Sequence, residues 1–104
     1  MPTRRKARPR PSPDLALARR YEAVVIEIKS ALARSLRRRR GAAKLSQGRL
    51  AERLGSSQSR VSKIEAGDPE VSLDLFVRAL LAAGATRGDV GRVIGQPSAS
   101  PTPR

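Results

Sequence analysis

The side chains best placed to do chemistry lie in a short segment around Ser62. Rotation of about 100° per residue in a helix over residues 57–66 turns Ser57, Val61 and Ile64 toward the protein interior. The opposite face carries small or polar residues: Ser59, Ser62, Lys63 and Ala66, with Gln58 and Arg60 on its flanks. Short polar side chains keep such a helix slim enough for the major groove of duplex DNA, which is about 12 Å wide. The pattern therefore favours a helix that can enter this groove.

A strong positive charge indicates a polyanionic partner. The 104 residues include 22 Lys and Arg against 9 Asp and Glu, a formal net charge of +13 at pH 7. Most of the excess lies in residues 1–13 and 34–44, which contain basic residues and no acid. Such clusters displace the counterions condensed on nucleic acid or on an anionic membrane surface. Tyr21 and Phe76 are the only aromatic residues, too few to stack single-stranded bases, so duplex is the better ligand.

The composition argues against several other functions. With no Cys and no His, the chain lacks thiolate zinc ligands, Cys nucleophiles and His-based catalytic triads. We expect neither enzyme activity nor a cofactor. No stretch approaches the ~18 uninterrupted apolar residues of a membrane span, and the first residues form no apolar signal core. The expected location is the cytoplasm, in association with the nucleoid, without a membrane partner.

Helix signals recur along the chain, and no pair of alternating β-branched runs predicts a hairpin. Five helices are expected, and their capping signals stand at Ser12-Pro13, Ser46, Ser57, Ser72 and Thr86. The first helix is long and runs to about Ala43, whereas glycines end the next three. Residues 13–95 are thus expected to form one compact all-α domain. Residues 1–12 are expected to be a disordered basic arm, and residues 96–104 a disordered tail.

The second and third helices form one unit. Three or four residues beginning with Gly55 join them, so they cross steeply, and Ala51 is small at the crossing point. Gly55 allows the positive φ angle that such a turn requires. Leu50, Leu54, Val61 and Ile64 are the apolar residues expected to lock the pair to the rest of the domain.

This stretch resembles the Cro/CI-type helix-turn-helix family, also called the XRE family, over about residues 32–84. The residues that carry the resemblance are Leu45-Ser46-Gln47, Leu50-Ala51, Gly55, Ser57-Gln58, Val61-Ser62, Ile64-Glu65 and Gly67. The resemblance implies a five-helix, lambda-repressor-like helix-turn-helix domain with an extended first helix. It assigns base contacts to Gln58, Ser59, Ser62 and Lys63, and places Arg60 at the groove edge. It also implies that Gln47 binds phosphate and supports Gln58, and that Arg40 and Glu65 form a buried ion pair.

Two positions depart from the family pattern. Lys44 stands where the family commonly has a helix-ending glycine, which leaves the shape of the first turn open. Arg49 replaces an acid near the start of the second helix, where it opposes the helix dipole and favours phosphate. Phosphate contacts are also expected from Lys44 and from Arg37, Arg38 and Arg39, although this run equally fits a solvated helix end.

The resemblance predicts a transcriptional regulator that binds double-stranded DNA at a palindromic operator as a homodimer and represses its own operon. The alternative is an antitoxin of HigA type, whose main role is to neutralise a small RelE/HigB-type toxin, with DNA binding as autoregulation. RNA is a further alternative ligand of the Arg-rich segments.

Two apolar sets are candidates for protein contacts. Val90, Val93 and Ile94 belong either to the core or to the homodimer contact, and we expect them to dominate the homodimer. The long first helix adds an apolar stripe beyond what the family needs: Tyr21, Val24, Val25 and Ile28. This stripe requires cover from the fifth helix, a second copy or another protein, and we expect a toxin to cover it.

Overall fold

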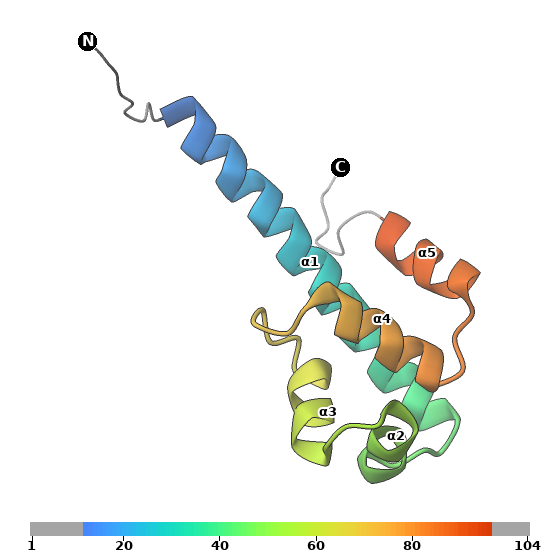
Figure 1. Cartoon of the computed structure of the whole chain (residues 1–104). Coiled ribbons are helices and arrows are strands. Elements are labelled where there is room, and N and C mark those ends of the chain that lie inside the picture. Colours follow the sequence, from blue (N-terminus) through green and yellow to red (C-terminus); the bar gives the residue numbers. More distant parts are fainter. Residues whose placement is uncertain (1–11, 97–104) are drawn as a thin grey trace.

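Five helices make up the part of the chain that the structure, a computed structural model, describes: residues 12–96 (Figure 1). They are α1 (Ser12–Ala42), α2 (Gln47–Leu54), α3 (Gln58–Glu65), α4 (Leu73–Ala82) and α5 (Arg87–Gly95). These residues contain no strand, so the predicted all-α, five-helix fold is confirmed. Within the same range, no helix combines the length and hydropathy that a transmembrane segment requires.

A capping side chain begins each of the four shorter helices. Ser46, Ser57 and Ser72 each accept a hydrogen bond from the backbone N–H three residues ahead, at 3.1 to 3.3 Å. Thr86 accepts one from the Asp89 N–H at 3.1 Å, and the Asp89 carboxylate accepts one from the Thr86 N–H at 2.9 Å, which completes a capping box. Because each bond spans only three residues, the local sequence determines where these helices start.

One hydrophobic core joins all five helices. Its most deeply buried side chains are Leu32, Leu36, Leu50, Val61, Ile64, Phe76 and Leu80. The second half of α1 contacts α3, α4 and α5, while α2 packs against α3 and α4. Ala51 of α2 is buried in this core. The C-terminal half of α1 is therefore the support against which α3 is held.

The first half of α1 protrudes from this core. In Figure 1 it extends, in blue, away from the other four helices. Tyr21 is 62% exposed and Val24 is 51% exposed, whereas Ile28 is the first residue of the apolar stripe that packs against the core. The fifth helix, one of the three expected covers, therefore does not bury Tyr21 or Val24.

The apolar residues of α5 are mostly used inside the chain. Val90 is buried in the core, and Val93 is partly buried against it. Ile94 remains 37% exposed. We expected this set to belong either to the core or to a homodimer contact, and the structure places Val90 and Val93 at the core.

The predicted basic arm and C-terminal tail lie outside the described residues, except at their inner ends. Ser12 is the first residue of α1, and Gln96 directly follows α5. The long first helix therefore begins where its capping signal predicted, and it ends at Ala42, one residue before the predicted end.

Candidate nucleic-acid interface

A tight turn sets the angle between α2 and α3. Gly55 has a φ of 68°, in the left-handed region that favours glycine. Its N–H donates to the Glu52 carbonyl at 3.2 Å, and the Ser56 N–H donates to the Ala51 carbonyl at 2.9 Å. These two bonds form a Schellman motif, which satisfies the carbonyls at the end of α2. Ser57 then caps α3, so three residues separate the helices.

The turn between α1 and α2 has the same shape although it lacks glycine. Lys44 has a φ of 55°, and it is the one non-glycine residue with positive φ among residues 12–96. The Lys44 N–H donates to the Gly41 carbonyl at 3.1 Å, and the Leu45 N–H donates to the Arg40 carbonyl at 3.0 Å. Lys44 thus replaces the family's glycine without altering the shape of the turn, but its side chain makes the positive φ angle less favourable.

The outward face of α3 presents the predicted base-contact residues to solvent. Gln58, Ser59, Ser62 and Lys63 are all exposed, and Val61 and Ile64 are fully buried on the opposite side. The inward placement of Ser57 was wrong, because its hydroxyl caps α3 at the exposed start of the helix. A Cβ atom added at Gly48 would lie 3.8 Å from the Gln58 Oε1, so Gln58 sits beside the first turn of α2.

An ion pair fixes the end of α3 to the end of α1. Arg40 binds Glu65 through two bonds, from Nε to Oε2 and from Nη2 to Oε1, the second at 2.9 Å. The Arg40 Nη1 also donates to the Leu45 carbonyl at 2.9 Å, in the turn before α2. Glu65 is 5% exposed. This pair, which the family resemblance implied, ties α1, the following turn and α3 together.

The surroundings of Glu65 keep it ionised. Burial alone raises the pKa of its carboxyl, but the hydrogen bonds from Arg40 and Gln47 and the charges of Arg40 and Arg37 outweigh burial and lower the pKa below its ordinary value. The hydrogen bond with Glu65 raises the pKa of Arg40 in turn. The pair is therefore fully charged at neutral pH.

Gln47 contacts this ion pair rather than Gln58. Its Nε2 donates to the Glu65 Oε1 at 3.0 Å. The expected support of Gln58 by Gln47 is not found among the hydrogen bonds of residues 12–96. One N–H of the Gln47 amide is left for another acceptor, because the amide has two.

The run of four arginines in α1 divides among several partners. Arg37 donates to the Glu65 backbone carbonyl at the C-terminal end of α3, and Arg39 lies 3.4 Å from the Asp89 carboxylate of α5. Arg40 binds the Glu65 side chain. Arg38 is exposed and has no ion pair within residues 12–96. Of the three arginines expected to contact phosphate, two thus have partners within the protein.

Lys29 is a third basic residue of α1 that positions α3, and its sequence position gave no sign of this role. The Lys29 Nζ donates to the Pro69 carbonyl at 2.8 Å, in the loop that follows α3. Forty residues separate the two in the chain, so no local signal could have indicated the contact. Lys29, Arg37 and Arg40 together hold the C-terminal end of α3 and its loop against α1.

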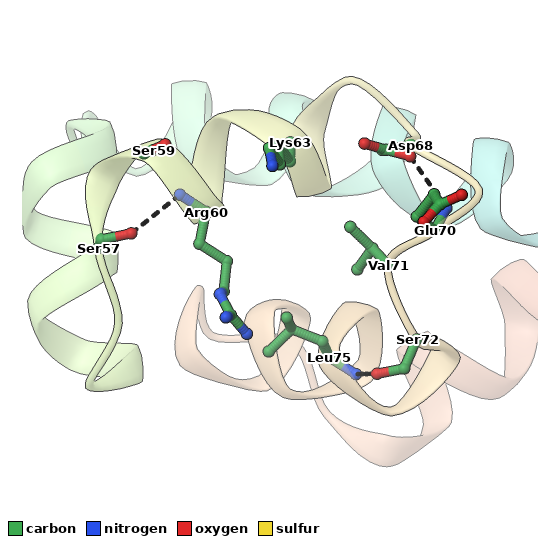
Figure 2. Close-up of a pocket in the computed structure, with 9 residues that line it drawn as sticks. All are labelled: Ser57, Ser59, Arg60, Lys63, Asp68, Glu70, Val71, Ser72 and Leu75. Carbon is green, nitrogen blue, oxygen red and sulfur yellow. Dashed lines mark hydrogen bonds between the residues drawn. The ribbon is translucent and has the colours of Figure 1, made fainter.

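A groove of about 480 Å³ runs beside α3. It is lined by Ser57, Ser59, Arg60, Lys63, Asp68, Glu70, Val71, Ser72 and Leu75. Figure 2 shows the Arg60 side chain extending from α3 across this groove toward Leu75 of α4, while Asp68 and Glu70 stand at the far end. The two carboxylates would repel a phosphate chain. Cations of α3 and carboxylates of the loop thus bound the groove on different sides.

Comparison with known proteins identifies the fold. A family model for a helix-turn-helix domain matches residues 31–93, from the second half of α1 into α5. The chain belongs to the helix-turn-helix domain family. Comparisons with curated proteins and with solved structures find no match. This helix-turn-helix domain includes every residue predicted to contact bases, and it makes the chain a DNA-binding helix-turn-helix protein.

Proposed function

We propose that this protein is a sequence-specific regulator of transcription, which binds a palindromic operator in double-stranded DNA as a homodimer and represses its own operon. The observation that carries the proposal is the outward face of α3. That face is exposed, polar and slim, and its helix is anchored at the far end by the Arg40–Glu65 pair. A rigidly held helix of this kind can present its side chains to base edges in the major groove.

The chemistry of the outward face suits hydrogen-bond recognition of bases. In the proposed complex, Lys63 donates to the O6 and N7 acceptors of guanine, and Gln58 pairs with the N6 and N7 of adenine through its amide. Ser59 and Ser62 donate or accept, and so add contacts without a fixed base preference. These four residues would select the sequence of each half-site.

Phosphate contacts would orient the domain without selecting sequence. Lys44 is exposed in the turn directly before the cap of α2, and Arg60 and Arg49 are exposed near the starts of α3 and α2. Gln47 retains one free amide N–H beside them. We propose that this group contacts the DNA backbone, while Arg38 adds longer-range attraction. Arg37 and Arg39 would contribute less, because their guanidinium groups already have partners.

Footprinting on the DNA upstream of the protein's own gene tests the proposal. We expect protection of two half-sites about one helical turn, ~34 Å, apart. A Lys63→Ala variant should lose the footprint at concentrations where an Arg78→Ala variant keeps it. Arg78 is a matched control because it is exposed on α4, where it pairs with Asp74 at 3.4 Å. Equal affinity of the wild type for upstream and random DNA would contradict a sequence-specific function.

An antitoxin is the second candidate function. The exposed apolar stripe in the first half of α1 favours it, because a small RelE/HigB-type toxin could bury this stripe without covering α3. The test is to express a basic protein encoded beside this gene, with and without this chain, and to measure growth. Growth arrest relieved by the wild type but not by a Tyr21→Glu variant would support the role. An absence of such a neighbouring gene, or growth unaffected by its product, would contradict it.

A further inference from the structure

The first half of α1 carries the largest set of exposed apolar side chains among residues 12–96. Leu15, Leu17, Tyr21, Val24, Val25 and Ile26 are all between 39% and 62% exposed. Leu17, Tyr21, Val24 and Ile28 follow one another at intervals of four, three and four residues. That spacing places them in one stripe along the helix, which enters the core of the domain at Ile28.

The charged residues beside this stripe have an unusual arrangement. Arg20 and Glu27 lie seven residues apart, so both lie on the same flank of the stripe. Neither has a charged residue three or four positions away in either direction, and neither has an ion pair within residues 12–96. Each therefore lacks a neighbour of opposite charge in its own helix that could stabilise it.

Two copies of α1 in antiparallel orientation can bury the apolar stripe and pair Arg20 with Glu27 in the same register. When Tyr21 faces the partner's Val24, Leu17 faces the partner's Ile28, and the two-fold axis passes near residues 22 and 23. The same register places Arg20 opposite the partner's Glu27, because like flanks meet in an antiparallel helix pair. By symmetry every contact occurs twice. Ala18 and Val25 occupy the other flank, where small and apolar residues allow close approach.

We propose that the protruding half of α1 is the homodimerisation surface of this protein, and that its occupant is the same half of α1 from a second copy. The proposed function requires a homodimer, and this proposal identifies its contact surface; it rests on the proposed function for the existence of a homodimer alone. Formation of the dimer requires no DNA.

Charge favours a second copy over a different protein. The whole chain has a net charge of +13, yet residues 14–29 contain three acidic and three basic residues. Two such segments meet without the repulsion that opposes contact between other parts of the molecule. The opposite signs at Arg20 and Glu27 make the surface complementary to itself. By contrast, α5 offers only Ile94 as an exposed apolar residue, since Val90 and Val93 serve its own core.

A charge exchange tests the contact on the full-length protein without DNA. Glu27→Arg should weaken dimerisation by about tenfold, because it converts two attractive contacts per dimer into two repulsive ones. The double variant Arg20→Glu, Glu27→Arg should restore the wild-type dissociation constant to within about threefold, because the pairs are remade with exchanged partners. The matched control is Arg19→Glu, which changes the charge of the neighbouring residue on a face turned away from the stripe, and it should have no comparable effect.

Sedimentation equilibrium measures these constants. The contact covers only about three helical turns, so we expect a dissociation constant in the micromolar range. In that range the average mass should rise with concentration from that of the 11.2 kDa monomer toward twice that value. Circular dichroism checks that each variant stays helical. Three results would overturn the proposal. The first is a wild type that stays monomeric at concentrations on the order of 100 µM. The others are a double variant that dimerises no more tightly than Glu27→Arg, and a dimer that is lost in Ile94→Glu but kept in Glu27→Arg. The first would leave the stripe to another protein.

The result separates this inference from the proposed function. A dimer that responds to charge exchange but binds all DNA alike would support the α1 contact and contradict the operator-binding function. Operator protection by a Glu27→Arg monomer with unchanged affinity would leave DNA recognition in place and overturn the need for this dimer.

Discussion

Lys63 and Arg38 are exposed cations in different positions, and this difference predicts different effects on DNA binding. Lys63 lies on the outward face of α3, whereas Arg38 lies on α1. Lys63→Ala should lower affinity for the operator by about 1–3 kcal/mol and relax preference at one base pair. Arg38→Ala should weaken all duplexes alike and reduce the salt slope by about one unit or less.

Fluorescence anisotropy with operator and random duplexes over a salt series measures both effects. An equal loss on the two duplexes for Lys63→Ala would refute its assignment to base contact. Selective loss at one base pair for Arg38→Ala would refute its assignment to phosphate.

Lys44 stores backbone strain that glycine would remove. A non-glycine residue in the left-handed region costs roughly 1–2 kcal/mol, and a glycine there loses part of this advantage through greater freedom in the unfolded chain. Lys44→Gly should therefore raise the free energy of unfolding by about 0.5–1 kcal/mol. If Lys44 contacts phosphate, the same variant should also bind DNA more weakly.

Urea unfolding measures the first effect, and anisotropy titration measures the second. Lys44→Ala is the control, because it removes the charge and keeps the positive φ of 55°. It should lose affinity without gaining stability. A Lys44→Gly variant less stable than the wild type would show that the side chain contributes more to the turn than its strain costs.

At the scale of elements, the Arg40–Glu65 pair joins two helices that are distant in sequence. Glu65→Ala leaves the Arg40 guanidinium without its partner in a mostly buried site, where its side chain is 22% exposed. The expected cost is about 3 kcal/mol, at the lower end for a broken buried pair because of that exposure. Replacing both residues, as in Arg40→Met with Glu65→Leu, should cost much less.

Thermal and urea unfolding compare these variants. Glu70→Ala is a suitable control, because Glu70 is exposed in the loop after α3, and its loss should change stability by less than about 0.5 kcal/mol. A double variant as unstable as Glu65→Ala would mean that the pair contributes through more than its charge.

The pKa values of Glu65, in the ion pair, and Asp89, in the capping box, predict that acid destabilises the fold. In the folded state the pKa of Glu65 is lowered mainly by Arg40 and Gln47 against the effect of burial, and that of Asp89 mainly by hydrogen bonds from Thr86. A lowered folded pKa means that the group stabilises the fold above its unfolded pKa and loses this contribution as pH falls through the folded value.

Stability should thus be constant from pH 7 to about pH 5, and should fall below about pH 4.5, the range in which unfolded carboxyls titrate. Urea unfolding at a series of pH values provides the measurement. Glu65→Gln should be less stable at pH 7 and should show a shallower decline toward pH 3. A wild-type stability that rises on acidification would contradict the assignment.

At the scale of the whole molecule, two adjacent residues of α5 differ in how they contact the core. Val93 packs against the core, whereas Ile94 is 37% exposed. Val93→Glu should therefore destabilise the fold by about 2–3 kcal/mol, since it buries part of an unpaired charge. Ile94→Glu should change stability by less than about 0.5 kcal/mol.

Thermal melts of the two variants, which introduce the same charge at adjacent positions, form a matched comparison. Equal melting temperatures would show that Val93 is not part of the core in solution. A folded, monomeric Val93→Glu protein would revive the expectation that α5 dominates the homodimer.

Local sequence determined the helices and the face of α3 that meets solvent. Caps such as Ser57 and the Thr86–Asp89 box act over three residues, so their effect does not depend on the rest of the fold. The spacing of Val61 and Ile64 likewise defines a buried side, and thereby an exposed side with Ser62 and Lys63. These features were predictable because both signal and consequence lie within one helix.

Only the tertiary structure decided which partner each basic residue of α1 has. Arg37, Arg39 and Arg40 are chemically identical, and successive positions point about 100° apart around the helix. Arg37 and Arg40 contact α3 and Arg39 contacts α5, because the fold places those helices on different sides of α1. The Lys29 contact with the Pro69 carbonyl spans 40 residues. The exposure of Tyr21 depends on where the core ends, which is a property of all five helices together. Contacts of this kind depend on how distant segments meet, and no local pattern encodes that.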